Sequence, residues 1–381
     1  GETTMGSWAW INSNEKGAPS PYHTLNCLGM LAWHRCSVVQ PFGEWTGSLV
    51  RRRTPIHYGG HYRAKGPLLH DPINNNDDDD DDNDNDDDDT SFFSSQHSDN
   101  HDSNVYYYPD EGCVDPGAAV RAMRSKAIEQ GATFIGNAHV TNLIRQPENG
   151  PITGVTYTSS SGDNEDDTTI TNHTIDSIDV VVVAGGVGSG DPVLGELPLL
   201  HSPGAIAYAK PNHDDNSSHP RLKRILVDTI RESHVLQRAD GTVLVGGGFL
   251  VVGGAASAQA RHDLPNTPSS ATTNTTDERI MGDALLHAAT PLAAPLLNRV
   301  SLTATVSRNR PMPADGFPAI GRLVDDDNLY YAVTHSGVTL SPLLGKLVAM
   351  ELTDNVHCHL LESFRPSRLF QNASPPDDTE I

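Results

Sequence analysis

The sequence predicts a mixed α/β (α+β) protein, in which an α/β domain of the nucleotide-binding type is interleaved with a mostly antiparallel β-sheet domain. Helix-like and strand-like segments alternate along the 381 residues. The apolar run over 177–184 is typical of a buried parallel strand, and Gly185 and Gly186 follow it at once. Several short β-like segments gather between residues 223 and 308, where a second sheet is expected.

A helix over 116–130 is the first element that the pattern indicates clearly. Apolar residues recur there on one helical face, Pro116 suits the first turn, and Gly131 ends the segment. Strands are predicted over 132–140 and 154–158, in the residues that follow.

The second half of the chain predicts short antiparallel strands and one further helix. The predicted strands are 223–230, 234–237, 242–246 and 302–308. Asp240 and Gly241 suit the turn of a hairpin between two of them. A strand over 329–334 and a helix over 340–352 follow, joined by a turn that contains glycine.

Five polar segments cannot bury enough apolar surface to order themselves and are expected to be solvent-exposed excursions. They are 74–104, 159–172, 212–220, 253–276 and the tail after Asn372. The second of them lies between two β-like runs, so it is expected to form a long hairpin tip. Eleven aspartates between Asp77 and Asp89 supply almost half of the formal net charge of −23. Because phosphate binding needs clustered Lys and Arg, a nucleic-acid partner is not expected.

The composition also argues against membrane-spanning, disulfide-rich and metal-binding classes. No apolar run approaches the roughly 20 residues that a membrane span requires, and the four cysteines include no CxxC pair. His57 and His61 have a spacing that metals use on helices, but the two glycines between them oppose a helix. We assign no metal to them or to the histidines at 357 and 359. No targeting pattern opens the chain. The compartment is left open, and a soluble protein of the cytoplasm or an organelle is favoured over a secreted one.

Five segments in a fixed order carry the functional signal. They are 4–14 (TMGSWAWINSN), 112–116 (GCVDP), 181–185 (VVVAG), 308–321 (RNRPMPADGFPAIG) and 334–345 (THSGVTLSPLLG). In this order and at these separations they resemble the FAD-dependent D-amino-acid oxidase superfamily, which includes glycine and sarcosine oxidases and D-amino-acid dehydrogenases. Taken singly, glycine-rich segments such as 185–188 and 246–248 could be tight turns and nothing more.

The resemblance implies a discontinuous, Rossmann-like FAD-binding domain and a separate substrate domain. The FAD-binding domain would consist of 1–40, 111–200 and 311–370, the substrate domain of 41–73 and 201–310, with a disordered insertion over 74–104 and a disordered tail over 371–381. Relatives carry a strand, a glycine-rich phosphate loop and a helix upstream of the segment that matches 4–14. About forty residues of that βαβ unit are therefore expected to be missing, which makes this chain N-terminally truncated, a fragment or a processed form.

The resemblance also implies which residues contact FAD. They are Gly6, Ser7, Trp8, Val140, Ala184, Gly185, Thr334, His335, Ser336, Gly337, Val338 and Thr339. Small residues near the start of the chain would let the backbone approach the flavin, and the last helix would aim its first amides at the ring. Without the resemblance, the first segment could equally be a helix cap with a buried Trp, and the last an ordinary capped helix.

Arg310 is implied to bind the substrate. In relatives that oxidise glycine or D-amino acids, the arginine of this motif holds the substrate carboxylate through a bidentate pair. Arg308 is a nearby competitor for that role, and Arg310 could also be an ordinary surface arginine. His335 is expected to contact the substrate as well as the cofactor.

The implied reaction oxidises the C–N bond of a small D-amino acid, glycine or sarcosine by hydride transfer to flavin N5. The imine would hydrolyse in water, and reduced FAD would pass its electrons to oxygen or another acceptor. Two alternatives stay open: an FAD dehydrogenase for another amine or a hydroxy acid, and a non-catalytic, FAD-free relative that uses its Asp tract as an acidic interaction or cation-binding segment. The oligomeric state is left open.

Overall fold

The structure is a computed structural model, and it describes the greater part of the chain. The described residues are 4, 6–13, 16, 20–52, 104–148, 150–161, 169–212, 221–247, 276–323 and 328–370. The Asp tract between Asp77 and Asp89, the histidines at 57 and 61, and the tail over 371–381 lie outside them. Predictions about these segments are therefore not tested.

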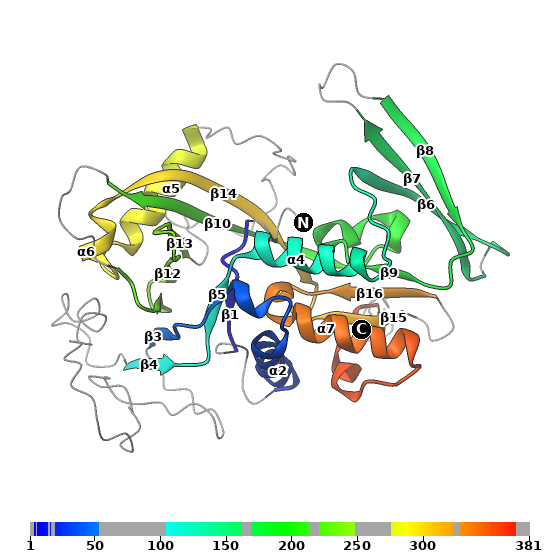
Figure 1. The fold of residues 1–381 in the computed structure, drawn as a ribbon, viewed down its shortest axis with the longest axis horizontal. Helices are drawn as coiled ribbons and strands as arrows, with labels where there is room; N and C mark the ends of the chain where they lie inside the picture. The colour runs from blue at the N-terminus through cyan, green and yellow to red at the C-terminus, as the bar shows by residue number, and fades with distance from the viewer. Residues whose placement is uncertain are drawn as a thin grey trace, which may run out of the picture.

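A seven-stranded sheet forms one side of the molecule (Figure 1). In sheet order its strands are β14 (Val300–Pro313), β10 (Leu199–Pro211), β13 (Val243–Gly247), β12 (Ser233–Gln237), β11 (Ile225–Asp228), β3 (Ser48–Arg52) and β4 (Asn104–Tyr108). All neighbours are antiparallel except β11 and β3. A mostly antiparallel sheet, as the sequence predicted, is thus present.

The two faces of this sheet pack against different neighbours. One face is covered by α5 (Thr276–Ala289) and α6 (Ala294–Leu297), which contribute Leu285 and others to a fully buried core. The opposite face packs against Trp8 and Trp10, near the start of the chain. Because side chains alternate along a strand, every second residue of the sheet points toward this N-terminal segment.

A smaller sheet and two helices bring distant parts of the chain together. The strands of this sheet, in sheet order, are β15 (Ala319–Arg322), β16 (Leu329–Val333) and β9 (Val181–Val183). The two helices are α7 (Gly337–Thr353) and α2 (Pro21–Arg35). β9 and β16 are parallel, so their carboxyl ends lie at the same edge. The two helices pack closely because Gly29 of α2 has no side chain. A Cβ there would lie 2.8 Å from the carbonyl oxygen of Thr339 in α7.

The remaining elements surround these two units. They are β1 (Trp10–Ile11), β5 (Gly112–Val114) and β2 (Gly43–Glu44) in one sheet, β6 (Ala138–Arg145), β7 (Ile152–Ser161) and β8 (Thr169–Asp176) in another, and α4 (Pro116–Glu129). Short 3₁₀ helices cover Gln40–Phe42, Gly186–Gly190, Pro192–Leu194, His359–Phe364 and Pro366–Leu369. In Figure 1 the β6-β7-β8 sheet projects to the upper right, away from the seven-stranded sheet.

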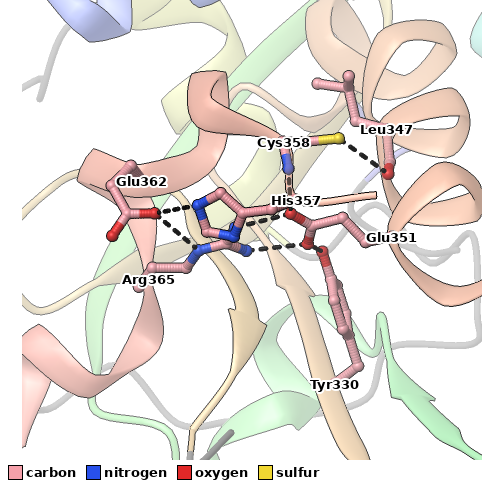
Figure 2. A network of polar contacts seen from close by, with 7 residues as sticks. All are labelled: Tyr330, Leu347, Glu351, His357, Cys358, Glu362 and Arg365. Atoms are coloured by element: carbon pink, nitrogen blue, oxygen red, sulfur yellow. Dashed lines mark hydrogen bonds and ion pairs between the residues drawn. The ribbon is translucent and has the colours of Figure 1, made fainter. Parts of the chain in front are cut away.

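A network around Glu351 anchors the far half of α7 (Figure 2). Arg365 donates hydrogen bonds of 2.9 and 2.6 Å to its two carboxylate oxygens, and the Tyr330 hydroxyl donates one of 2.6 Å. The backbone N–H of Cys358 donates a fourth, of 2.9 Å. Burial by itself would raise the pKa of Glu351, but the bonds from Arg365 and Tyr330 outweigh it and lower the pKa to about 2. The ionised carboxylate therefore fixes α7 against β16 and the following chain.

Several predicted elements are confirmed. The helix predicted over 116–130 is α4, whose N-cap Asp115 accepts a 2.9 Å bond from the backbone of Ala118. Gly131 follows that helix with a φ of +97°, and Gly241 turns between β12 and β13 with a φ of +83°. The four cysteines are free, as expected.

Other predicted elements are wrong in extent or burial. The strand predicted over 132–140 begins only at Ala138, because Asn137 has a φ of +50° and interrupts an extended chain. Only Val181–Val183 of the predicted buried strand is extended, and Val182 is 41% exposed because β9 is an edge strand among the described residues. The segment predicted over 223–230 pairs antiparallel to β12 but parallel to β3. The helices α2 and α5 and the strand β10 were not predicted.

Within the described residues, no helix combines the length and the apolar character needed to cross a membrane. No three His, Cys, Asp or Glu side chains of that part gather as a metal site. His357 instead contacts the carboxylate of Glu362 at 2.9 Å (Figure 2).

Candidate functional site

The candidate site lies at a junction, where the N-terminal segment 6–13 meets the start of α7. In the first turn of α7, the Thr339 hydroxyl donates a 3.3 Å hydrogen bond to the carbonyl oxygen of Trp10, 329 positions away. The Trp33 side chain of α2 donates a 2.9 Å bond to the carbonyl oxygen of Val338. Two of the segments that the resemblance assigned to FAD are therefore neighbours in space.

The start of α7 is open toward this junction. Ser336 occupies the N-cap, no side chain caps the first amides, and the first turn has no acidic residue. A Cβ added to Gly337 would meet only a methyl group of Thr334, at 4.0 Å. Ala184 and Gly185 follow β9 at the same sheet edge and are both exposed. Unpaired amides at the positive end of a helix favour an anionic ligand here.

A polar network surrounds the Ser336 hydroxyl. The Tyr22 hydroxyl lies 2.6 Å from the Ser336 oxygen and 3.3 Å from the His335 ring nitrogens. Lys16 Nζ donates a 3.1 Å bond to the same serine oxygen. Burial, followed by the charges of Lys16 and Arg310, lowers the pKa of His335 to about 3. The imidazole is therefore neutral near pH 7, so it can form hydrogen bonds with a ligand but supplies no positive charge.

Glu111 fixes the N-terminal segment through hydrogen bonds. Its fully buried carboxylate accepts hydrogen bonds from the Trp10 indole at 3.1 Å, the Ser48 hydroxyl at 2.6 Å and the Ser13 backbone at 3.3 Å. These bonds link β1 to β3 of the large sheet. The sequence contained a signal for this residue, since Glu111 directly precedes the Gly-Cys-Val-Asp-Pro segment, but no role was predicted for it.

His234 of β12 lies against the aromatic part of that N-terminal segment. Its ring centre is 5.6 Å from that of Trp8, edge to face, and 5.9 Å from that of Trp10. Gly246, the neighbour of His234 on β13, leaves room for Trp8, because a Cβ there would overlap the indole nitrogen. Burial, followed by the charge of Arg310, lowers the pKa of His234 to about 4. This histidine, which was not predicted, is also neutral near pH 7.

Arg310 of β14 reaches the same junction. Its side chain remains accessible to solvent, yet the protein around it lowers its pKa through burial. Its guanidinium lies over Gly204 of β10, where a Cβ would be 2.8 Å from Nη2. Its charge lowers the pKa of both His234, in β12, and His335, in the turn between β16 and α7. Among the described residues, Arg310 forms no ion pair with a carboxylate.

The other predicted residues divide into two groups. Ser7 is part of the junction, and its buried hydroxyl has no hydrogen-bond partner within the described residues. Ser189, which was not predicted, lies beside Gly185, and its buried hydroxyl likewise has no hydrogen-bond partner within the described residues. Val140 belongs instead to β6, where it pairs with Tyr157, so no contact in the described structure brings it to the junction.

Comparison with known proteins decides the family. Residues 93–350 match the family model described as FAD dependent oxidoreductase, abbreviated DAO. The chain belongs to this family. Its members depend on FAD, so this chain is an FAD-dependent oxidoreductase, as the resemblance implied. A search of curated proteins finds no match to the DAO-family chain.

Solved structures share the fold of this DAO-family chain at low sequence identity. L-proline dehydrogenase from P. horikoshii has a TM-score of 0.64 and 16% identity, over 94% of this chain and 86% of that chain. L-amino acid deaminase from Proteus vulgaris has a TM-score of 0.62 and 17% identity, over 97% of this chain and 84% of that chain. Glycine oxidase from Geobacillus kaustophilus has a TM-score of 0.62 and 16% identity, over 97% of this chain and 89% of that chain. The predicted fold class is confirmed by this likeness.

The junction has the chemical features that FAD requires. The open first turn of α7 suits an electron-rich or anionic group. The buried hydroxyls of Ser7 and Ser189 have no partner among the described residues and are available to a ligand rich in heteroatoms. The described residues of this DAO-family chain therefore fit the cofactor.

Proposed function

We propose that this protein oxidises the C–N bond of a small amino or imino acid, with FAD as its cofactor. One observation carries the proposal. Arg310 presents an accessible guanidinium without a carboxylate partner in the described structure, close to residues of both chain ends. A cation in such a position is suited to bind the carboxylate of a substrate.

Arg310 would orient the substrate by holding its carboxylate through two parallel hydrogen bonds. His234 and His335, both neutral near pH 7, do not add positive charge beside it and could donate or accept single hydrogen bonds. The indoles of Trp8 and Trp10 would exclude water from the reacting carbon. Bidentate binding fixes the plane of the carboxylate, which in turn restricts the direction of the neighbouring C–N bond.

We assign FAD to the residues at the junction. Those available for it are Gly6, Ser7, Trp8, Ala184, Gly185, Thr334, His335, Ser336, Gly337, Val338 and Thr339, with Val140 proposed from the family resemblance alone. When bound, FAD would supply the acceptor for the hydride that leaves the carbon atom of the C–N bond. The first amides of α7 would stabilise negative charge that develops beside them. We also retain the proposed division into an FAD-binding domain and a substrate domain.

The proposal is tested by mixing the FAD-reconstituted protein with amines in the absence of oxygen. The visible flavin absorption should bleach with at least one of glycine, sarcosine, proline, alanine, aspartate or glutamate, the last four in both enantiomers. Readmission of oxygen, or addition of an artificial electron acceptor, should then restore the absorption and identify the acceptor. A flavin-loaded protein that none of these compounds reduces would refute the proposal. Bleaching by 2-hydroxy acids alone would support the alternative dehydrogenase.

A further inference from the structure

Arg308 and Arg310 follow one another along the same face of β14. Residues two apart on a strand point to the same side, and their Cα atoms are about 7 Å apart. The register of the sheet pairs Arg308 with Gly204, and the guanidinium of Arg310 lies over that same glycine. Arg310 therefore leans along the sheet toward the position of Arg308. This places two guanidinium groups in succession on the face that looks toward Trp8 and Trp10.

Neither arginine has an acidic partner among the described residues. Arg308 Nη1 donates a 2.7 Å bond to the carbonyl oxygen of the adjacent Ser307, while its buried Nε has no acceptor within the described structure. A buried donor without a partner costs about 1–3 kcal/mol. Two like charges on the same face of one strand also repel one another. Both costs are removed if an anion binds between the two guanidinium groups or across them.

Tyr208 lies on the same face of β10 as Gly204, four residues along the strand, and the charge of Arg308 reaches it. Burial raises the pKa of Tyr208, while the nearby charges of Arg238 and Arg308 act in the opposite direction. No hydrogen bond of its hydroxyl occurs in the described part of the chain. A phenol that stays protonated can donate a hydrogen bond to a carboxylate. Arg238 is less available for a ligand, because its charge already acts on Asp240.

We propose that Arg308 and Tyr208 form a second carboxylate subsite, so that the substrate is a dicarboxylic amino or imino acid. Arg310 binds the carboxylate beside the amine, and Arg308 binds the distal one. A spacing of about 7 Å between the two positions on the strand suits carboxylates that are separated by a few bonds, as in aspartate, glutamate or iminodiacetate. The inference rests on the proposed function for the reaction itself, but the dianion subsite can be tested without turnover.

The first test measures binding of compounds that cannot be oxidised as amines. Calorimetric titration of the FAD-reconstituted protein should show that succinate binds about 10- to 100-fold more tightly than butyrate, because the second carboxylate adds charge-assisted hydrogen bonds. Arg308→Gln should abolish this preference, and Arg308→Lys should retain part of it. Arg121→Gln, which removes an exposed cation from α4, should leave it unchanged. Equal binding of succinate and butyrate to the unmodified protein would overturn the proposal, as would a preference that survives in Arg308→Gln.

The second test uses turnover and separates the two proposals. Aspartate against asparagine, glutamate against glutamine, and iminodiacetate against sarcosine are compared by kcat/KM, with both enantiomers where they exist. The dicarboxylates should be preferred, and Arg308→Gln should lose that preference mainly through KM while the values for the matched amides change little. Oxidation of sarcosine or asparagine as fast as the dicarboxylates would overturn the subsite and leave the proposed function intact. Succinate preference without oxidation of any amine would refute the proposed function and support the subsite.

Discussion

Two arginine clusters in the described part of the chain have opposite surroundings. Arg365 donates hydrogen bonds to both carboxylate oxygens of Glu351, and this carboxylate also accepts a hydrogen bond from the Tyr330 hydroxyl (Figure 2). Arg308 and Arg310 face the junction of the chain ends and have no carboxylate among the described residues. The first cluster is electrostatically complete, so it can contribute to stability by itself. The second is incomplete, which is the condition expected of a site that takes its anion from a ligand.

Removal of the charge at Arg310 should cause the largest effect. Arg310→Gln is expected to lower kcat/KM for the amine substrate about 10³-fold, because truncation of a hydrogen-bonded charge pair costs about 2–5 kcal/mol. The loss should be mainly in KM. Steady-state kinetics measures it, and flavin fluorescence checks that FAD remains bound. Unfolding should be unaffected, because this side chain has no acidic partner in the described fold. An unchanged KM would remove Arg310 from the carboxylate role.

Glu351→Gln should make the first cluster incomplete and destabilise the fold. The substitution removes the main counterion of Arg365, whose side chain is 19% exposed, and leaves only the more distant carboxylate of Glu362, 3.7 Å from Nε. Loss of one partner of such a pair is expected to lower the free energy of unfolding by about 3 kcal/mol, measured by urea denaturation. Glu362→Gln is the matched control, because that carboxylate is 61% exposed and also contacts Arg365. It should cost less than about 1 kcal/mol, and equal effects of the two substitutions would contradict the comparison.

The sequence predicted the elements whose signals are local. The α4 helix has Pro116 and Gly131 at its ends, and the turn at Gly241 has a typical hairpin sequence. The ordered set of segments also indicated the family, which the match over 93–350 confirms. Arg310 could be chosen because it stands before a proline in one of those segments.

The partners across sheets could not be predicted from one sequence. His234 lies against Trp8 only because the register of β12 turns it to that face, and Glu111 meets Ser48 through pairing of distant strands. The burial of β9 was predicted wrongly because an apolar strand does not reveal whether it lies at a sheet edge. That Arg308 has no carboxylate partner among the described residues is likewise a property of the fold, and it cannot be inferred from the sequence.

Acid should remove the contribution of Glu351 in a defined pH range. Its pKa falls from an ordinary value of 4.5 to about 2 in the folded protein. Because the folded value is the lower one, the stabilisation is complete above about pH 4.5 and is lost as the pH falls toward 2. Urea midpoints measured between about pH 5 and pH 3 should converge for the original protein and Glu351→Gln. If the difference between the two urea midpoints stays constant over that range, protonation of Glu351 does not affect stability, and the lowered pKa is contradicted.

Gly204→Ala should produce the smallest effect, because it moves the cation of the second cluster without removing it. A Cβ at Gly204 would lie 2.8 Å from Nη2 and 2.9 Å from Nε of Arg310, so the guanidinium must shift. The atoms that must give way belong to the flexible end of a side chain, so the free energy of unfolding should change by less than about 0.5 kcal/mol. Because the shifted guanidinium would hold the substrate carboxylate less well, KM should rise about fivefold, which corresponds to about 1 kcal/mol of binding free energy. Gly345→Ala is the control, since its added Cβ would have no described atom within 4 Å outside its own helix backbone. A raised KM in the Gly204 variant alone would show that the position of the Arg310 charge, as well as its presence, serves the substrate.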